Sequence, residues 1–259
     1  MTPLGLMLAL TFATGVVDAV GYLRLDQVFA GNMTGNVVIL GMAATGGTDL
    51  PVLGPSVALV SFLVGAAVTG RVLRTAAPGW THRCTGLLGG AGLVLAATAL
   101  VLGVTGVGDP GTRASMAASL ALAMGAQAAT ARHLAVKDVT TVVVTSTLTG
   151  LAADSRLGAA RGQGAGRRAA AVTLIIAGAV AGAALCQVNE GLAVASAAFV
   201  VLAVTVLGHA SARHPAATTT RLSTPPRYPA TEGPRGRQHT YPRVRRQHQA
   251  YRRPLMPQQ

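Results

Sequence analysis

Residues 4–44 decide the fold, and they read LGLMLALTFATGVVDAVGYLRLDQVFAGNMTGNVVILGMAA. The first part, residues 4–23, is apolar over about the 20 residues that a membrane-spanning helix needs, yet it carries a carboxylate at Asp18. A charged patch with Arg24 and Asp26 follows. The next apolar stretch, residues 28–44, is shorter and more polar. This pattern predicts a membrane helix that is interrupted, either as a broken helix or as a re-entrant segment.

The whole chain has the composition of an integral membrane protein. Of its 259 residues, 51% are hydrophobic and only 11% are charged, whereas a soluble domain has roughly a quarter charged residues. Aromatic residues make up only 3%, so the apolar side chains are mostly small ones, which suit close helix–helix contact in lipid. We therefore predict an all-α integral membrane protein whose partner is the lipid bilayer.

Eight apolar stretches recur along the chain, and the basic residues indicate how many of them cross. Residues 28–44 and 139–153 are too short and polar to be independent spans. Cytoplasmic loops are rich in Lys and Arg, and only with six spans do both basic loops and both termini share one side. The basic residues of the two loops are Arg71, Arg74 and Arg83, and Arg156, Arg161, Arg167 and Arg168. We predict about six transmembrane helices with cytoplasmic termini.

The two halves of the chain share a pattern. Gly15-Val-Val-Asp18-Ala19 is followed by Asn32-Met-Thr34-Gly35-Asn36, and Gly125-Ala-Gln127-Ala-Ala129 is followed by Thr147-Leu-Thr149-Gly150. Two further apolar spans follow each pair of motifs, and a unit of three spans places the next unit upside down. We predict two inverted three-helix repeats, about residues 4–107 and 114–208, each with an interrupted first helix. Chance similarity in a chain rich in Ala, Gly and Thr is the alternative.

Residues 211–259 differ in character from the rest. They hold ten of the 21 Lys and Arg residues and one acidic residue, and they have few aliphatic side chains. Such a segment cannot bury enough apolar surface to offset the entropy lost on ordering. We predict a transmembrane domain at residues 1–210 and a disordered, basic cytoplasmic tail. The tail would attract anionic lipid headgroups or stay solvated without a dedicated partner, and nucleic acid is not an expected partner.

Two sets of residues match a known pattern. The first set is Gly15-x-x-Asp18-Ala19-x-Gly21-Tyr22-Leu23, Phe29, Met33-Thr34-Gly35-Asn36 and Leu40-Gly41. The second set is Gln127-Ala128, Arg132, Thr140-Thr141 and Thr145 to Gly150. On these residues the sequence resembles the YoaK family, also called the domain-of-unknown-function 1275 family. The resemblance covers roughly residues 5–210. It implies a bacterial cell-membrane protein with about six spans, and it implies no established biochemical activity.

Asp18 is the most informative candidate, because a lone carboxylate at membrane depth costs at least a few kcal/mol. It is either a coupling or gating acid, or a structural carboxylic acid bonded to the broken backbone near Asn32. A broken-helix solute site would be lined by polar side chains, with glycines allowing close backbone approach. The predicted lining residues are Asp18, Asn32, Thr34, Asn36, Gln127 and Thr147, and the glycines are Gly31, Gly35 and Gly150.

The remaining polar residues favour transport over catalysis. Arg24 and Asp26 are interpreted as an interfacial pair at the membrane surface or as a charged gate. Cys84 and Cys186 lack the spacing of a metal site or a disulfide framework, and no catalytic motif is present. We therefore expect no enzyme activity and no cofactor. The sequence favours a secondary transporter or channel-like permease for a small solute. The alternative is a non-transporting sensor or scaffold that acts through its basic tail.

Overall fold

The computed structural model describes residues 2–46, 49–134, 144–155 and 164–213. Within these ranges the chain forms eight α-helices and no strand. The helices are α1 Pro3–Arg24, α2 Met33–Ala43, α3 Leu53–Leu73, α4 His82–Thr105, α5 Pro110–Leu134, α6 Val144–Ala153, α7 Ala165–Cys186 and α8 Glu190–Arg213. The predicted all-α fold is confirmed for these residues. The remainder of the predicted tail, residues 214–259, lies outside them.

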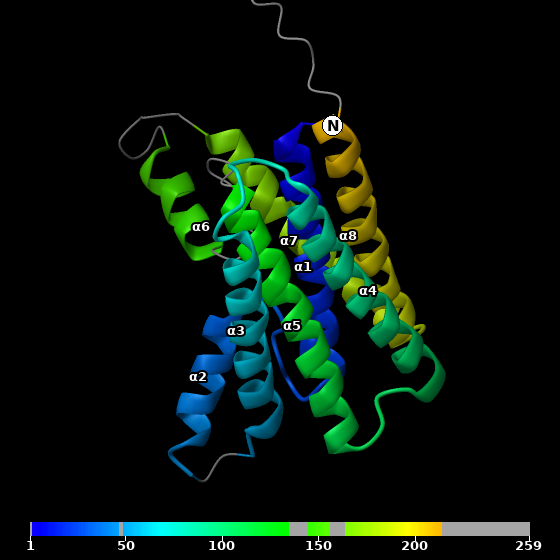
Figure 1. Ribbon diagram of the computed structural model, residues 1–259. Coiled ribbons are helices and arrows are strands. Elements are labelled where there is room, and N and C mark those ends of the chain that lie inside the picture. The colour runs from blue at the N-terminus through cyan, green and yellow to red at the C-terminus, as the bar shows by residue number, and fades with distance from the viewer. Residues whose placement is uncertain (1, 47–48, 135–143, 156–163, 214–259) are drawn as a thin grey trace, which may run out of the picture. The chain divides into compact units, whose positions relative to one another are not determined.

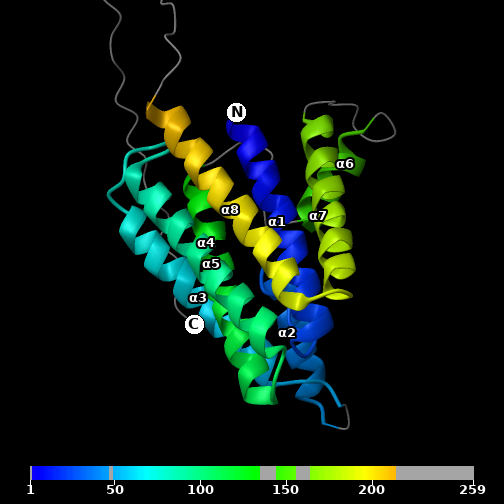
Figure 2. The same cartoon turned by 90° about the vertical axis from the view of Figure 1, so that its right-hand side faces the viewer.

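Five of the described helices, α1, α3, α4, α7 and α8, are long and apolar enough to cross a membrane. The two short helices are α2 with 11 residues and α6 with 10. At about 1.5 Å per residue they reach roughly half the 30 Å thickness of a hydrocarbon core. In both views α2 lies toward one end of the bundle and α6 toward the other (Figures 1 and 2).

Local sequence sets where several helices begin and end. The Thr2 side chain accepts a hydrogen bond from the Gly5 N–H at 3.3 Å, and a proline follows it at the first helical position of α1. Asn189 caps α8 in the same way, because its Oδ1 accepts from the Leu192 N–H at 3.1 Å. The helix α4 ends at Gly106, whose φ of 66° suits a residue without a Cβ.

The helices α1 and α5 are the inner helices of the bundle. α1 packs against α5, α7 and α8, whereas α5 packs against α1, α3 and α4. Fully buried leucines, such as Leu10 on α1 and Leu120 on α5, belong to one continuous core. The helix α5 has 25 residues, but it carries several polar side chains and is not among the five most apolar helices. Because protein surrounds most of α5, its polarity does not have to be accommodated by lipid.

Two helix crossings bring backbones into direct contact at glycines. A Cβ at Gly15 on α1 would overlap the Ile175 carbonyl oxygen on α7. A Cβ at Gly125 on α5 would overlap the Phe62 carbonyl oxygen on α3. The opposite helices α7 and α3 also contribute glycines, Gly178 and Gly65, and each lies against a backbone carbonyl of its partner helix. Small residues permit such close approach, which supplies the van der Waals contact that holds helices together in lipid.

Candidate functional site

The interruption predicted after the first helix is present, and it returns the chain into the bundle. The helix α1 ends at Arg24, and the next residues Asp26 and Gln27 have left-handed φ values of 57° and 56°. The Val28 N–H then donates to the Gly21 carbonyl oxygen at 3.2 Å. The chain therefore doubles back beside the last turn of α1 before α2 begins. We call residues 25–32 the connecting segment.

Asp18 is the residue that the connecting segment reaches. The Gly31 N–H donates to Asp18 Oδ1 at 2.6 Å, and the backbone amides of Ala30 and Asn32 also interact with this carboxylate. These amides precede the first turn of α2, where free N–H groups and the helix dipole favour a negative group. Asp18 is therefore partnered by backbone, about 9 Å along the helix axis from the end of α1.

Gln127 joins the same region from the inner helix α5. Its Nε2 donates to Thr14 Oγ1 at 3.2 Å and lies 3.4 Å from the Leu10 carbonyl oxygen. Thr14 is one turn before Asp18 on the same face of α1, and its methyl group lies 2.8 Å from the position of a Cβ at Gly31. The Gln127 side chain is only 1% exposed, and its Oε1 has no hydrogen-bond partner within the described residues. Buried acceptors of this kind usually bind water or a ligand.

Asn36, which was predicted to line a solute site, binds the backbone of the connecting segment. Its Oδ1 accepts from the Phe29 N–H at 2.9 Å, and its Nδ2 donates to the Phe29 carbonyl oxygen at 2.6 Å. A Cβ at Gly35 would lie 2.5 Å from the Phe29 ring, which in turn packs against Tyr22 with ring centroids 5.1 Å apart. Asn36 and Gly35 therefore hold the connecting segment in place. The side chains of Asn32 and Thr34 are exposed.

The other predicted residues of the second half, Thr147 and Gly150, lie on α6. Thr147 is 8% exposed, and a Cβ at Gly150 would lie 2.7 Å from the Arg168 guanidinium. Arg168 also forms an ion pair with Asp154 at 2.6 Å. Among the described helices, α6 contacts only α7 and α2 contacts only α3. The structure thus brings Asp18, Gly31, the Asn32 backbone and Gln127 together and places Thr147 and Gly150 elsewhere. The residues that precede α6, 135–143, lie outside the described ranges.

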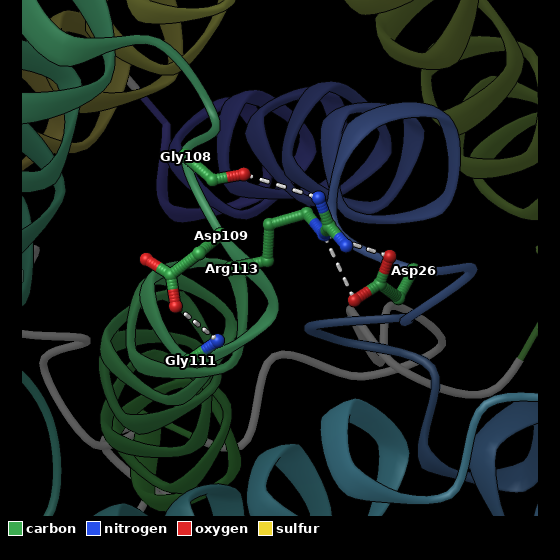
Figure 3. A network of polar contacts seen from close by, with 5 residues as sticks. All are labelled: Asp26, Gly108, Asp109, Gly111 and Arg113. Carbon is green, nitrogen blue, oxygen red and sulfur yellow. Dashed lines mark hydrogen bonds and ion pairs between the residues drawn. The ribbon is translucent and has the colours of Figure 1, made fainter.

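Two ion pairs flank the connecting segment, and sequence reasoning did not find their partners. Arg24 and Asp26 do not pair with each other. Arg24 Nε lies 3.4 Å from Glu190 Oε1 on α8, and its Nη2 donates to the Cys186 carbonyl oxygen at 2.6 Å. Arg113 Nε on α5 lies 2.9 Å from Asp26 Oδ1. Figure 3 shows this pair. The partners are 87 to 166 positions distant in the chain, so no local pattern could have indicated them.

The N-terminal turn of α5 is held by hydrogen bonds where it meets Asp26. Asp109 Oδ2 accepts from the Gly111 N–H at 2.9 Å, and its Oδ1 accepts from the Thr112 hydroxyl at 2.5 Å (Figure 3). The hydrogen bond from the Thr112 side chain, followed by that from the Gly111 amide, lowers the pKa of Asp109 below its usual value of 3.8. Arg113 Nη1 donates to the Gly108 carbonyl oxygen at 3.1 Å, which fixes the guanidinium toward Asp26.

An open apolar groove of about 680 Å³ lies on another part of the bundle. It runs between the C-terminal half of α4 and the N-terminal half of α8, where Leu100, Gly103, Asn189 and Phe199 line it. Leu100 is 69% exposed and Phe199 is 73% exposed, as expected of side chains that face lipid. None of the predicted site residues lines this groove. Within the described ranges no three His, Cys, Asp or Glu residues are grouped as metal ligands would be.

The five apolar helices and the close glycine crossings define the class of this protein as a helical membrane protein. A family model described as a protein of unknown function, DUF1275, matches residues 6–207. The chain belongs to this family, and the resemblance stated from its motifs is confirmed.

One curated relative is the UPF0700 transmembrane protein YoaK of Bacillus subtilis (strain 168). It is 28% identical to this chain over 153 residues, which cover 58% of this chain and 65% of the relative. The match therefore spans just under two thirds of the relative's length. No solved structure matches the chain.

Proposed function

We propose that this protein is a secondary transporter or channel-like permease for a small solute, in which Asp18 is the coupling or gating acid. The observation that carries the proposal is the hydrogen bond between Asp18 and Gly31 at an interrupted helix. Irregular backbone at membrane depth persists where protein or a water-filled cavity satisfies its polar groups. Interrupted helices with exposed amides are the sites at which many transporters bind solutes and coupling ions.

The proposal includes two inverted repeats, α1–α4 and α5–α8, with α5 as the sixth span. Contacts between the helices support it, because helix pairs that involve one half have equivalent pairs when α1–α4 are matched with α5–α8. α1 packs on α7 as α5 packs on α3, and α1 packs on α8 as α5 packs on α4. α2 packs on α3 as α6 packs on α7. Gly15 and Gly125, which the repeat motifs align, occupy the two equivalent crossings.

In this account each half supplies part of a solute pathway. Asp18 and the backbone at Gly31 lie on one side, and Gln127 presents from α5 a carbonyl oxygen that has no hydrogen-bond partner among the described residues. Such an arrangement fits an uncharged or cationic solute better than an anion, because a carboxylate already occupies the amides before α2. We propose Asn32 and Thr34 as additional lining residues. The protein would bind and move its solute without changing it chemically.

A solute screen tests this function. The melting temperature of the purified protein is measured in detergent against amino acids, sugars, polyols, amines and monovalent cations. A ligand that binds only the native state raises this temperature by mass action. We expect one class of solute to stabilise the wild type and to lose its effect in Asp18→Asn and Asn32→Ala. The exposed carboxylate Asp49 supplies the control variant Asp49→Asn, which should respond like the wild type. If no solute shifts the wild type, the broken helix is structural.

A further inference from the structure

We propose that the ion pairs Arg24–Glu190 and Asp26–Arg113 form a latch, which holds the connecting segment closed over Asp18 and opens to admit solvent to it. This inference rests on the proposed transport function and names the part that controls access to the site. The two pairs tie the interruption after α1 to the start of α8 and to the start of α5. Both anchors belong to the second half of the chain, so opening the latch would separate the two halves at this end.

The Arg24 side of the latch clamps the end of α7 as well as the start of α8. Its guanidinium donates to the carbonyl oxygen of Cys186, the last residue of α7, and pairs with Glu190 in the first turn of α8. Both charges complement the helix dipoles, since the cation meets a C-terminus and the carboxylate lies at an N-terminus. The Arg24 side chain is 40% exposed, and partly solvated pairs of this kind break readily.

The Asp26 side of the latch holds strained backbone. Asp26 and Gln27 are consecutive non-glycine residues in the left-handed region, a conformation that costs free energy and persists only where the surroundings impose it. The contact of both Asp26 carboxylate oxygens with Arg113 Nε imposes it, because Arg113 is itself fixed by the Gly108 carbonyl oxygen (Figure 3). Loss of this ion pair would let the two residues relax toward ordinary φ values. The part of the connecting segment next to Asp26 would then move.

Movement of the connecting segment would expose buried groups at this end of the bundle. Leu25 and Val28 are fully buried, and the Gly31 N–H is hydrogen-bonded to Asp18. Cys186 is 3% exposed, and Arg24 lies on its carbonyl oxygen. Cys186 is therefore a native reporter of the latch. Cys84, in the first turn of α4, is also buried and free, and no latch residue contacts it by a hydrogen bond or ion pair in the described part of the chain.

The test measures how fast N-ethylmaleimide modifies each thiol of the full chain in detergent, with peptide mass spectrometry to separate Cys186 from Cys84. We expect Asp26→Asn and Arg113→Gln each to speed the modification of Cys186 about fivefold, the change allowed by loss of one partly exposed ion pair. Asparagine tolerates the left-handed conformation as aspartate does, so Asp26→Asn removes the charge without adding backbone strain of its own. The double variant should react no faster than either single one, because both substitutions break one interaction. Cys84 should stay protected, and Asp49→Asn should match the wild type.

Three results would overturn the latch. The first is an unchanged rate at Cys186 in both single variants. The second is a double variant whose effect is the product of the two single effects. The third is equal acceleration at Cys84 and Cys186, which would mean that the whole bundle loosens. This readout requires no solute, so it separates the two proposals. An opening latch without any solute response would contradict transport alone, whereas a solute response with unchanged thiol rates would contradict the latch alone.

Discussion

The Asp18 carboxylate accepts a hydrogen bond of 2.6 Å from the backbone N–H of Gly31, 13 residues further along the chain. This contact joins the first membrane helix to the segment that interrupts it. It explains how a carboxylate is tolerated inside an apolar helix, since the hydrogen bond from Gly31 and the neighbouring amides of Ala30 and Asn32 replace part of its hydration. It also places the one acidic residue of α1 where a movement of the connecting segment would alter its surroundings.

The substitution Asp18→Asn should weaken the connection between α1 and the start of α2. The amide oxygen can still accept from the Gly31 N–H, but the NH2 group would face the amides of Ala30 and Asn32. We expect a loss of about 1–2 kcal/mol, because donors then oppose donors. Reversible unfolding in mixed micelles measures the loss. Wild-type stability in Asp18→Asn would mean that these amides do not hold the carboxylate.

Gly31→Ala should destabilise the protein by about 1–3 kcal/mol through overpacking. The added Cβ would lie 2.8 Å from the Thr14 methyl group, which a β-branched side chain cannot easily move. Gly41→Ala in α2 is the matched control, since nothing lies within 4 Å of its added Cβ. That variant should be neutral or slightly more stable because alanine favours a helix. Equal effects of the two substitutions in the same unfolding assay would contradict the packing described around Asp18.

Asn36→Ala should lower the free energy of unfolding by about 2 kcal/mol. The substitution leaves both the N–H and the carbonyl group of Phe29 without the side chain that now binds them. Asn32→Ala removes an exposed amide that makes no capping hydrogen bond, so its effect on stability should be within about 0.5 kcal/mol. Both variants lose the same side-chain atoms relative to the wild type. The stability of both is measured by thermal melting. If Asn32→Ala destabilised the protein more than Asn36→Ala, the role of Asn36 in holding Phe29 would be contradicted.

Asp109 gives a dependence of stability on pH. Its pKa is lowered in the folded protein, chiefly by the Thr112 hydroxyl, so the ionised form stabilises the fold. That contribution is fully present above the usual pKa of 3.8 and is lost as the pH falls through the lowered value. Asp109→Ala should therefore melt at a lower temperature than the wild type near neutral pH. The difference should shrink when melting is measured progressively below pH 3.8, and a constant difference would contradict this role.

Much of the architecture was predictable because membrane burial leaves a strong periodic and compositional signal. The interruption after Arg24 and the need of Asp18 for a partner near Asn32 both follow from the cost of charge and open backbone in lipid. The repeat motifs also aligned Gly15 with Gly125, the two residues that the structure places at helix crossings. Their partner glycines on α7 and α3 were not predicted, since many glycines share that composition and only packing selects among them.

The details of the site depended on contacts that sequence spacing does not encode. Thr14 could have been found, because it lies one turn before Asp18 on the same helical face. Asn36 was predicted to line a solute site, whereas its hydrogen bonds to Phe29 can be recognised only once the connecting segment folds back. The contact between Arg113 and Asp26 joins residues 87 positions apart. It arises from how α5 meets the end of α1, which no local pattern specifies.

Solute-coupled proton movement in sealed vesicles tests the central claim most directly. The wild type, Asp18→Asn and Asp49→Asn are reconstituted in liposomes that contain a pH-sensitive dye, and each solute that stabilises the wild type is added outside. The account predicts a change of internal pH with the wild type and with Asp49→Asn, and none with Asp18→Asn. An equal pH change with Asp18→Asn would contradict the role of Asp18 as the coupling or gating acid. Solute uptake by Asp18→Asn at the wild-type rate, with no change of internal pH in either protein, would contradict both the coupling and the gating role.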